Sequence, residues 1–98
     1  MAEFLVERYV SRSDAAALRA GFERARREAD RMSAVGIPVR LVRSIFVPED
    51  ETCFYLYEGE SIDAVLEAAG RAELRVDRIA ETASSHGVEL EAPVKGGE

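Results

Sequence analysis

The chain has 98 residues, and its 13 basic and 19 acidic side chains give a net charge of −6. This length suits one domain with a single core, and 47% hydrophobic and 33% charged residues are typical of a globular protein. Acidic chains are repelled by phosphate backbones and anionic lipid heads. No apolar run approaches the roughly 20 residues that span a bilayer. We therefore expect no nucleic-acid partner and no membrane contact, and the absence of a basic, apolar leader predicts a cytoplasmic protein.

A strand and a long helix are predicted for the first third of the chain. Residues 3–10 alternate like a half-buried strand. One face carries Phe4, Val6 and Val10, the other carries Leu5, Glu7 and Tyr9, and Arg8 interrupts the apolar face. Asp14 and nearby serines offer N-cap oxygens. Apolar residues then recur at helical spacing, at Leu18, Phe22, Ala25, Ala29 and Met32, and Gly36 and Pro38 end the helix.

Two strands joined by a tight turn are predicted for residues 39–57. Pro48 suits the first corner of a turn and Asp50 tolerates the geometry that follows. In the first strand, strict alternation places Val39, Leu41, Ile45 and Val47 on one face. In the second strand, Thr52, Phe54 and Leu56 alternate with Cys53, Tyr55 and Tyr57. Because both faces are largely apolar, we expect this hairpin to supply the central pair of strands.

A second helix and a short strand complete the predicted fold. Ser61 caps a helix whose apolar stripe is Ile62, Val65, Leu66 and Ala69, and residues 77–83 form the last strand. The order βαββαβ predicts an α+β, ferredoxin-like fold, with two helices on one face of a four-stranded antiparallel sheet. This domain covers residues 1–83. Residues 84–98 are small and polar, and we expect them to form a flexible tail.

The sheet face opposite the helices is the candidate binding surface. Alternation assigns Phe4, Val6, Phe54 and Leu56 to the covered face. The expected open-face residues are Leu5, Glu7, Tyr9, Cys53, Tyr55, Tyr57, Ile79 and Glu81. Such a mixed face is too apolar to remain in water, and large exposed apolar patches mark interfaces or ligand grooves. We expect a homodimer through this face, with room for a pocket between the two sheets.

Each candidate side chain has a structural and a functional interpretation. Glu7 and Glu81 can act as acids or ligands, although such carboxylates more often pair with arginine. Tyrosines on strands usually pack across the sheet, and a lone thiol such as Cys53 is more often a small buried hydrophobe than a nucleophile. The ligand-binding candidates are Glu7, Tyr9, Arg43, Tyr55, Tyr57 and Glu81, and the metal candidates are Cys53 and His86.

The charged face of the long helix is predicted to pair with itself. Opposite charges stand four residues apart in Glu23–Arg27, Arg24–Glu28 and Arg26–Asp30. The chain has no HExxH, CxxC, GxGxxG, P-loop or GxSxG pattern. The absence of these motifs makes an enzyme less favoured without excluding one. The RNA-recognition domain shares the βαββαβ order, but its basic-glycine-aromatic signature is absent and the net charge has the wrong sign. We reject that interpretation.

Three segments resemble a family of small bacterial proteins that is common in actinobacteria. They are FLVERY (residues 4–9), RSIFVPEDETCFYLYE (43–58) and DRI (77–79). The family is mostly of unknown function and is also labelled nickel-binding. The resemblance implies a ferredoxin-like fold, a homodimer and nickel or another transition metal as a ligand, and Cys53 matches the family motif. Glu73 stands where the family pattern usually has Gly, so we expect a different turn before the last strand.

Two functional hypotheses follow. The first is a small dimeric protein that binds a metal ion or small ligand at the open face, without turnover. The second is an enzyme of the dimeric ferredoxin-like barrel kind, acting on a small organic molecule through Glu7, Arg43 and Tyr55. The sequence favours the first, and it names neither the ligand nor a substrate.

Overall fold

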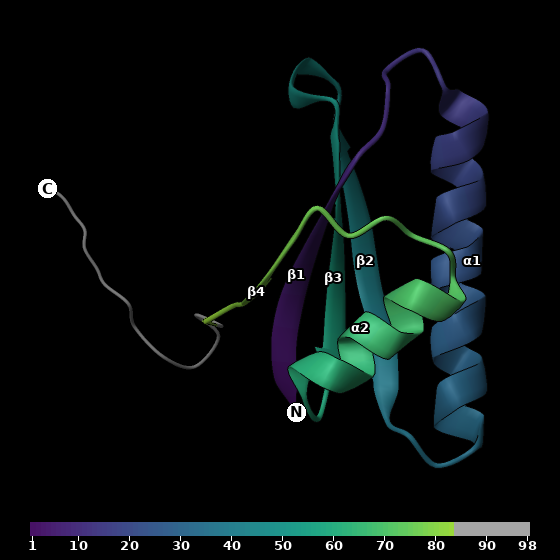
Figure 1. Cartoon of the computed structure of the whole chain (residues 1–98), viewed down its shortest axis with the longest axis vertical. Helices are drawn as coiled ribbons and strands as arrows, with labels where there is room; N and C mark the ends of the chain where they lie inside the picture. The colour runs from purple at the N-terminus through teal and green to yellow at the C-terminus, as the bar shows by residue number, and fades with distance from the viewer. Residues whose placement is uncertain (84–98) are drawn as a thin grey trace, which may run out of the picture.

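The computed structural model describes residues 1–83 and has the predicted order of elements (Figure 1). One antiparallel sheet contains β1 (Ala2–Tyr9), β2 (Val39–Val47), β3 (Thr52–Gly59) and β4 (Arg78–Glu81). The helices are α1 (Ala15–Ala34) and α2 (Ile62–Arg71), and a 3-10 turn, Pro48–Asp50, joins β2 to β3. The fold is therefore α+β and ferredoxin-like, as predicted. The tail expected at residues 84–98 lies outside the described residues.

The strands are ordered β2-β3-β1-β4 across the sheet. The prediction of a central hairpin is right for β3 and wrong for β2, which is an edge strand. The apolar content of a strand indicates whether its two faces are buried. It does not indicate whether a neighbouring strand pairs with its backbone, and that pairing is what distinguishes an interior strand from an edge strand. Both faces of β2 carry apolar residues, so its sequence resembles that of an interior strand.

Helix α1 begins and ends as its sequence predicts. The Asp14 carboxylate accepts a hydrogen bond from the Ala17 backbone N–H at 3.0 Å. At the other end Gly36 has a φ of 93°, and the Ile37 N–H donates to the Met32 carbonyl at 2.9 Å. A residue with positive φ that closes the last turn in this way is the usual helix stop.

Helix α2 buries a different stripe from the predicted one. Ser61 caps it, and its hydroxyl accepts from the Ala64 N–H at 3.1 Å. Val65 and Ala69 are buried as predicted, but Ile62 and Leu66 are 43% and 38% exposed. Alanines take their place: Ala64 and Ala68 are buried, which lets the helix lie close to the sheet. Ile62 and Leu66 therefore face solvent.

Glu73 closes α2 in the backbone conformation that glycine favours. Its φ is 59°, and the next residue, Leu74, donates from its N–H to the Ala69 carbonyl at 3.0 Å. The turn thus takes the left-handed conformation although Gly is absent, and the expected difference from the family's turn stays a prediction. The glutamate adopts the left-handed conformation despite the steric cost of its Cβ.

The hydrophobic core lies between the sheet and the two helices. Its fully buried large side chains are Val6, Met32, Val39, Cys53, Tyr55, Tyr57 and Val65. The β1 and β3 members come from one face of the sheet, so the opposite face is left without a covering layer in residues 1–83. No helix in the described part of the chain is long and apolar enough to cross a membrane.

Candidate binding face

Strand register shows which residues lie on the uncovered side of the sheet. Directly opposed residues of an antiparallel pair project to the same face. Leu5 opposes both Leu56 and Ala80, and Leu56 also opposes Arg43. We call the resulting surface the open face; it comprises Glu3, Leu5, Glu7, Tyr9, Arg40, Arg43, Ile45, Val47, Thr52, Phe54, Leu56, Glu58, Arg78 and Ala80.

A bulge in β2 sets the composition of this face. The register shifts between Leu41 and Arg43, which leaves Val42 as an extra residue. Strict alternation had grouped Ile45 with Val39 and Leu41. With the bulge, Val39 and Leu41 lie on the helix side, whereas Arg43 and Ile45 lie on the open face. That part of the sequence prediction is therefore wrong, and the reason is a single inserted residue.

Two ion pairs border an apolar strip on the open face. Arg40 donates from Nε and Nη2 to Glu58 Oε1 at 3.1 and 3.0 Å. On the same face, towards the opposite edge of the sheet, Arg78 Nη1 donates to Glu7 Oε2 at 2.7 Å. The apolar side chains between these pairs are Leu5, Ile45, Phe54 and Leu56. Glu7 thus has an arginine partner, which is the structural interpretation of this carboxylate.

Arg43 differs from the paired arginines around it. It opposes Leu56 across the β2–β3 ladder and is exposed. No ion pair between residues 1 and 83 involves its guanidinium. Tyr9, also on the open face, is 61% exposed. Of the predicted ligand-binding residues, Glu7 and Tyr9 therefore lie on the open face as predicted, and Arg43, which the sequence did not assign to a face, lies there too.

Tyr55 and Tyr57 lie on the opposite side from the predicted one. They oppose Val6 and Phe4 in the β1–β3 ladder and are fully buried beneath the helices, as is Cys53. The assignment of Cys53, Tyr55 and Tyr57 to the open face is therefore wrong, as is that of Phe54 and Leu56 to the covered face. Both sets of β3 residues are apolar, so alternation alone did not determine which set faces the core.

Burial also changes the chemistry of these three side chains. It raises the pKa of Tyr55 to about 12 and raises the pKa of Tyr57 further. The pKa of the Cys53 thiol is raised as well, again chiefly by burial. A protonated, inaccessible thiol is a poor metal ligand and a poor nucleophile. Cys53 is therefore a small core residue.

Ile79 and Glu81 also project to the helix side. In the β1–β4 ladder Ile79 opposes Val6 and Glu81 opposes Phe4. Ile79 packs against the core, and Glu81 is exposed at the sheet margin. Their assignment to the open face is wrong because β4 pairs only with β1, and its register is set by that strand alone.

The three residues of the enzyme hypothesis are not brought together. Glu7 and Arg43 lie on the open face, whereas Tyr55 is buried on the helix side. Glu7 is also already paired with Arg78. No single cavity can present a carboxylate, a guanidinium and a phenol drawn from these three positions.

A partly buried polar contact under α1 was missed by the sequence reasoning. Arg8 Nη1 donates to the Tyr55 hydroxyl at 3.0 Å, and the Phe22 ring meets the Tyr55 ring edge-on at 5.9 Å. Gly21 makes room for this pair: a Cβ at that position would lie 2.5 Å from Arg8 Nη1 and 3.0 Å from the Tyr55 hydroxyl. The signal in the sequence was Arg8 itself, which interrupts the apolar face of its strand.

A metal centre is not formed by the described residues. Within residues 1–83 no three His, Cys, Asp or Glu side chains are grouped closely enough to hold an ion. Cys53 is buried in the core, and His86 lies outside the described residues. On the open face Glu3 and Glu58 do oppose each other directly, which is a pair of donors rather than a complete site.

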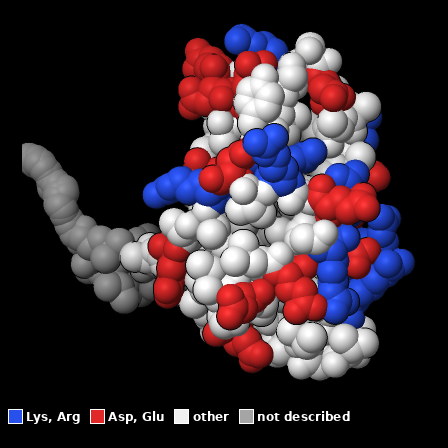
Figure 2. Space-filling view, in the orientation of Figure 1, with Lys and Arg blue, Asp and Glu red and all other residues white. Residues whose placement is uncertain are grey.

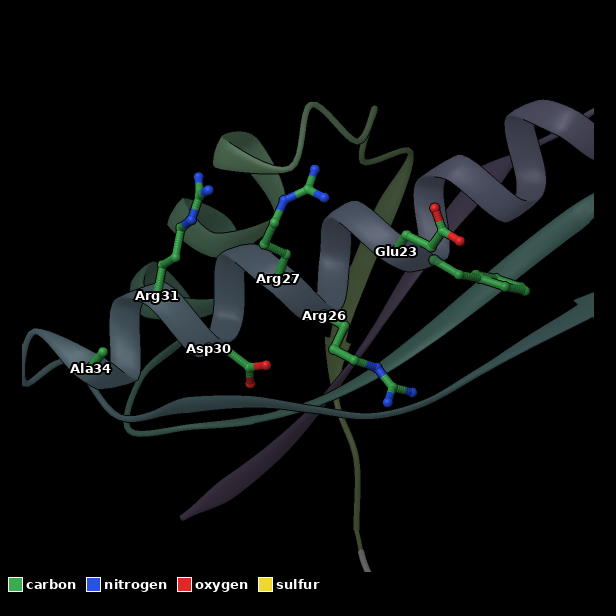
Figure 3. A pocket seen from close by; sticks show the side chains of 7 residues that line it. Glu23, Arg26, Arg27, Asp30, Arg31 and Ala34 are labelled. Atoms are coloured by element: carbon green, nitrogen blue, oxygen red, sulfur yellow. The ribbon is translucent and has the colours of Figure 1, made fainter.

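A surface hollow that follows α1 is not a binding pocket. It measures about 650 Å³, and all seven lining residues come from this helix. Figure 3 shows Arg27 and Arg31 on one side of the helix and Arg26 and Asp30 directed to another. Pockets that hold ligands enclose most of their surface, whereas this hollow has no opposing wall.

The charged face of α1 pairs differently from the prediction. Arg31 Nη1 lies 2.9 Å from Glu28 Oε2, and Arg24 Nε donates to the Ala72 carbonyl at 2.7 Å. Arg26 takes part in no ion pair within residues 1–83. Figure 2 shows arginines gathered along the flank that α1 forms. This helix therefore presents more free positive charge than its sequence suggested.

Comparison with known proteins supports the fold. No protein-family model matches the chain, and no curated protein does. Among solved structures it is similar to SCO4226 from Streptomyces coelicolor A3(2), with a TM-score of 0.55 and 23% identity. The match covers 85% of this chain and 98% of that protein. At this level of identity the similarity shows a shared fold and carries no function across.

Proposed function

We propose that this protein is a small binding protein whose open faces pack together in a homodimer and hold a small ligand at the seam. The observation that carries the proposal is the strip formed by Leu5, Ile45, Phe54 and Leu56 between two ion pairs. A contiguous apolar surface bordered by charge is typical of an interface or ligand groove. A two-fold dimer would cover the strip with its own copy.

Arg43 favours an organic anion as the ligand. Its guanidinium is exposed beside Leu56, and no carboxylate in residues 1–83 forms an ion pair with it. A guanidinium binds a carboxylate in a bidentate, charge-assisted manner, while the apolar strip would hold the body of the molecule. An aromatic or aliphatic carboxylate satisfies both features.

A metal ion such as nickel is the second candidate. It is favoured by Glu3 and Glu58, whose carboxylates oppose each other on β1 and β3. Two copies would supply four carboxylates at the seam, although nickel prefers nitrogen and sulfur donors. Cys53 has no part in this version of the proposal, because it faces the core.

The dimer is tested by a matched pair of substitutions. Ile45 is 47% exposed on the open face and Ile62 is 43% exposed on α2, so each can accept a glutamate without a change in the core. We expect Ile45→Glu to sediment as a monomer in analytical ultracentrifugation, and wild type and Ile62→Glu as dimers. A monomeric wild type, or equal behaviour of the two variants, would refute the dimer.

Ligand class is tested by calorimetric titration. Wild type is titrated with benzoate, and separately with nickel, cobalt, copper and zinc ions. If the ligand is an organic anion, wild type should bind benzoate and Arg43→Gln should not. If the ligand is a metal ion, wild type should bind a metal and Glu58→Gln should not. Cys53→Ser should bind as wild type does. A dimer that binds neither class would refute the ligand part of the proposal.

A further inference from the structure

The outer edge of β2 offers an open position for one more strand. β2 is the terminal strand of the sheet. The backbone of its first residue, Val39, already has hydrogen-bond partners in α1. The Val39 N–H donates to the Ser33 hydroxyl at 3.2 Å, and this hydroxyl donates to the Val39 carbonyl at 2.7 Å. From Arg40 onward, the hydrogen bonds of this backbone within residues 1–83 go to β3. Free strand edges accept extended segments through backbone hydrogen bonds.

A groove beside this edge indicates which side chains such a segment would carry. The groove measures about 300 Å³ and is lined by Phe22, Arg26, Leu41, Val42, Arg43 and Ser44. Phe22, Leu41 and Val42 supply the apolar part of its lining. Arg26 and Arg43 add two guanidinium groups that form no ion pair among residues 1–83. A segment of alternating apolar and acidic residues can place its apolar side chains in the groove and its acidic side chains beside Arg43, on the open face.

The chain itself contains such a segment in residues 88–92, Val-Glu-Leu-Glu-Ala. In an extended conformation Val88, Leu90 and Ala92 share one side, and Glu89 and Glu91 share the other. The segment is five residues long, as is the regular part of β2 beyond the bulge, residues 43–47. We propose that residues 88–92 of a second copy of this chain pair with the outer edge of β2.

The length of chain between Ala83 and Val88 is what requires a second copy. Ala83 follows β4, at the opposite edge of the sheet from β2. A strand beside β2 would lie four strand spacings from β4, about 19 Å, whereas five fully extended residues reach about 18 Å. The direct path is filled by the sheet, so the real route over either face is longer. A copy's own segment therefore cannot reach its own β2 edge, so a second copy has to supply it.

Cysteine cross-linking in the full chain tests this contact. Ser44→Cys and Leu90→Cys variants are mixed in equal amounts, oxidised, and analysed by peptide mass spectrometry. We expect a disulfide joining positions 44 and 90 of different chains, at a yield several-fold above that of a control mixture of Asp63→Cys and Leu90→Cys. Equal yields would overturn the proposal. A 44–90 link within one chain of the double variant at high dilution would also overturn it.

Charge reversal tests the arginine contacts. Glu89→Arg/Glu91→Arg, introduced with Leu90→Cys, should lower the yield of the 44–90 link several-fold. Arg43→Glu in the Ser44→Cys chain should restore it, because the charge pairing is then exchanged. No effect of reversal, or no rescue, would contradict the proposal.

This contact shares Arg43 with the open face, and one variant away from Arg43 separates the two proposals. Leu5→Glu, on β1 and not opposite Arg43, should abolish dimerisation through the open face and leave the 44–90 link in place. If the variant keeps its circular dichroism spectrum but loses both the dimer and the 44–90 link, the proposed pairing of residues 88–92 with β2 is refuted.

Discussion

Tyr55 and Tyr57 illustrate how two identical residues, two positions apart, differ in their contribution to stability. Both are fully buried on the same face of β3. The Tyr55 hydroxyl accepts a hydrogen bond from Arg8 at 3.0 Å. The Tyr57 hydroxyl is buried without a partner in residues 1–83. A desolvated hydroxyl that makes no hydrogen bond opposes folding.

Removal of each hydroxyl should therefore change stability in opposite directions. We expect Tyr57→Phe to raise the free energy of unfolding by about 1 kcal/mol, because it deletes an unsatisfied group. Tyr55→Phe should lower it by about 1–2 kcal/mol, because Arg8 is left without its acceptor. Urea denaturation followed by circular dichroism measures both. A destabilised Tyr57→Phe would indicate a bonding partner outside residues 1–83.

Glu51 links the β2–β3 turn to the loop after β1 and carries a pH dependence. Its carboxylate accepts from the Arg12 backbone N–H at 2.9 Å, and this bond is the main reason its pKa is lowered from the usual 4.5. The folded state therefore holds this proton less tightly than the unfolded state. Its stabilising contribution is complete above pH 4.5 and is lost as the pH falls through the lowered folded-state pKa.

Glu51→Gln should remove this part of the acid sensitivity. We expect its unfolding free energy to fall less steeply than that of wild type as the pH drops below about 4.5. Thermal melts across this range measure the difference. Glu49→Gln, on the same turn, serves as the control and should keep the wild-type slope, whereas parallel curves for wild type and Glu51→Gln would contradict the linkage.

At the scale of elements, the contact of α1 with the sheet depends on a glycine that helix propensity disfavours. Gly21 is buried in α1 where the helix passes over the Arg8–Tyr55 pair. Gly70, in the last turn of α2, is exposed and has no neighbouring atom within 4 Å of where a Cβ would be. Two glycines inside helices therefore have different causes: one is required by close packing, and the other has no such constraint.

Alanine substitution at the two positions should separate these causes. Gly70→Ala should raise the unfolding free energy by about 1 kcal/mol through helix propensity. Gly21→Ala should lower it by about 1 kcal/mol, because displacement of Arg8 breaks its bond to Tyr55 and outweighs the gain in propensity. Chemical denaturation of both variants checks this. A stabilised Gly21→Ala would mean that Arg8 can move at no cost.

At the scale of the whole molecule, the sequence predicted elements better than faces. Helix limits were readable because Asp14 and Gly36 are specific signals, and the order of elements defines the fold. The faces of β3 were not readable, since Phe54 and Leu56 are as apolar as Tyr55 and Tyr57. The bulge at Val42 was also hidden, because no glycine marks it. The open face was therefore predicted as a surface, while several of its residues were assigned wrongly.

Cys53 provides a probe of the whole fold. Its side chain is fully buried, and burial raises the pKa of its thiol. We expect alkylation by iodoacetamide to be slow in the native protein and fast in urea, because reaction requires global opening. The rate should rise in the destabilised Tyr55→Phe variant. Equally fast reaction of native and unfolded chains would contradict the placement of Cys53 in the core.

The bulge in β2 also affects how copies of this protein behave when they are concentrated. A long, flat edge strand lets sheets add to one another without limit, which produces fibres. The extra residue at Val42 interrupts the hydrogen-bonding repeat of the edge and increases its local twist. Only a short partner strand can then pair with it. We therefore expect this single inserted residue to oppose open-ended polymerisation through the β2 edge.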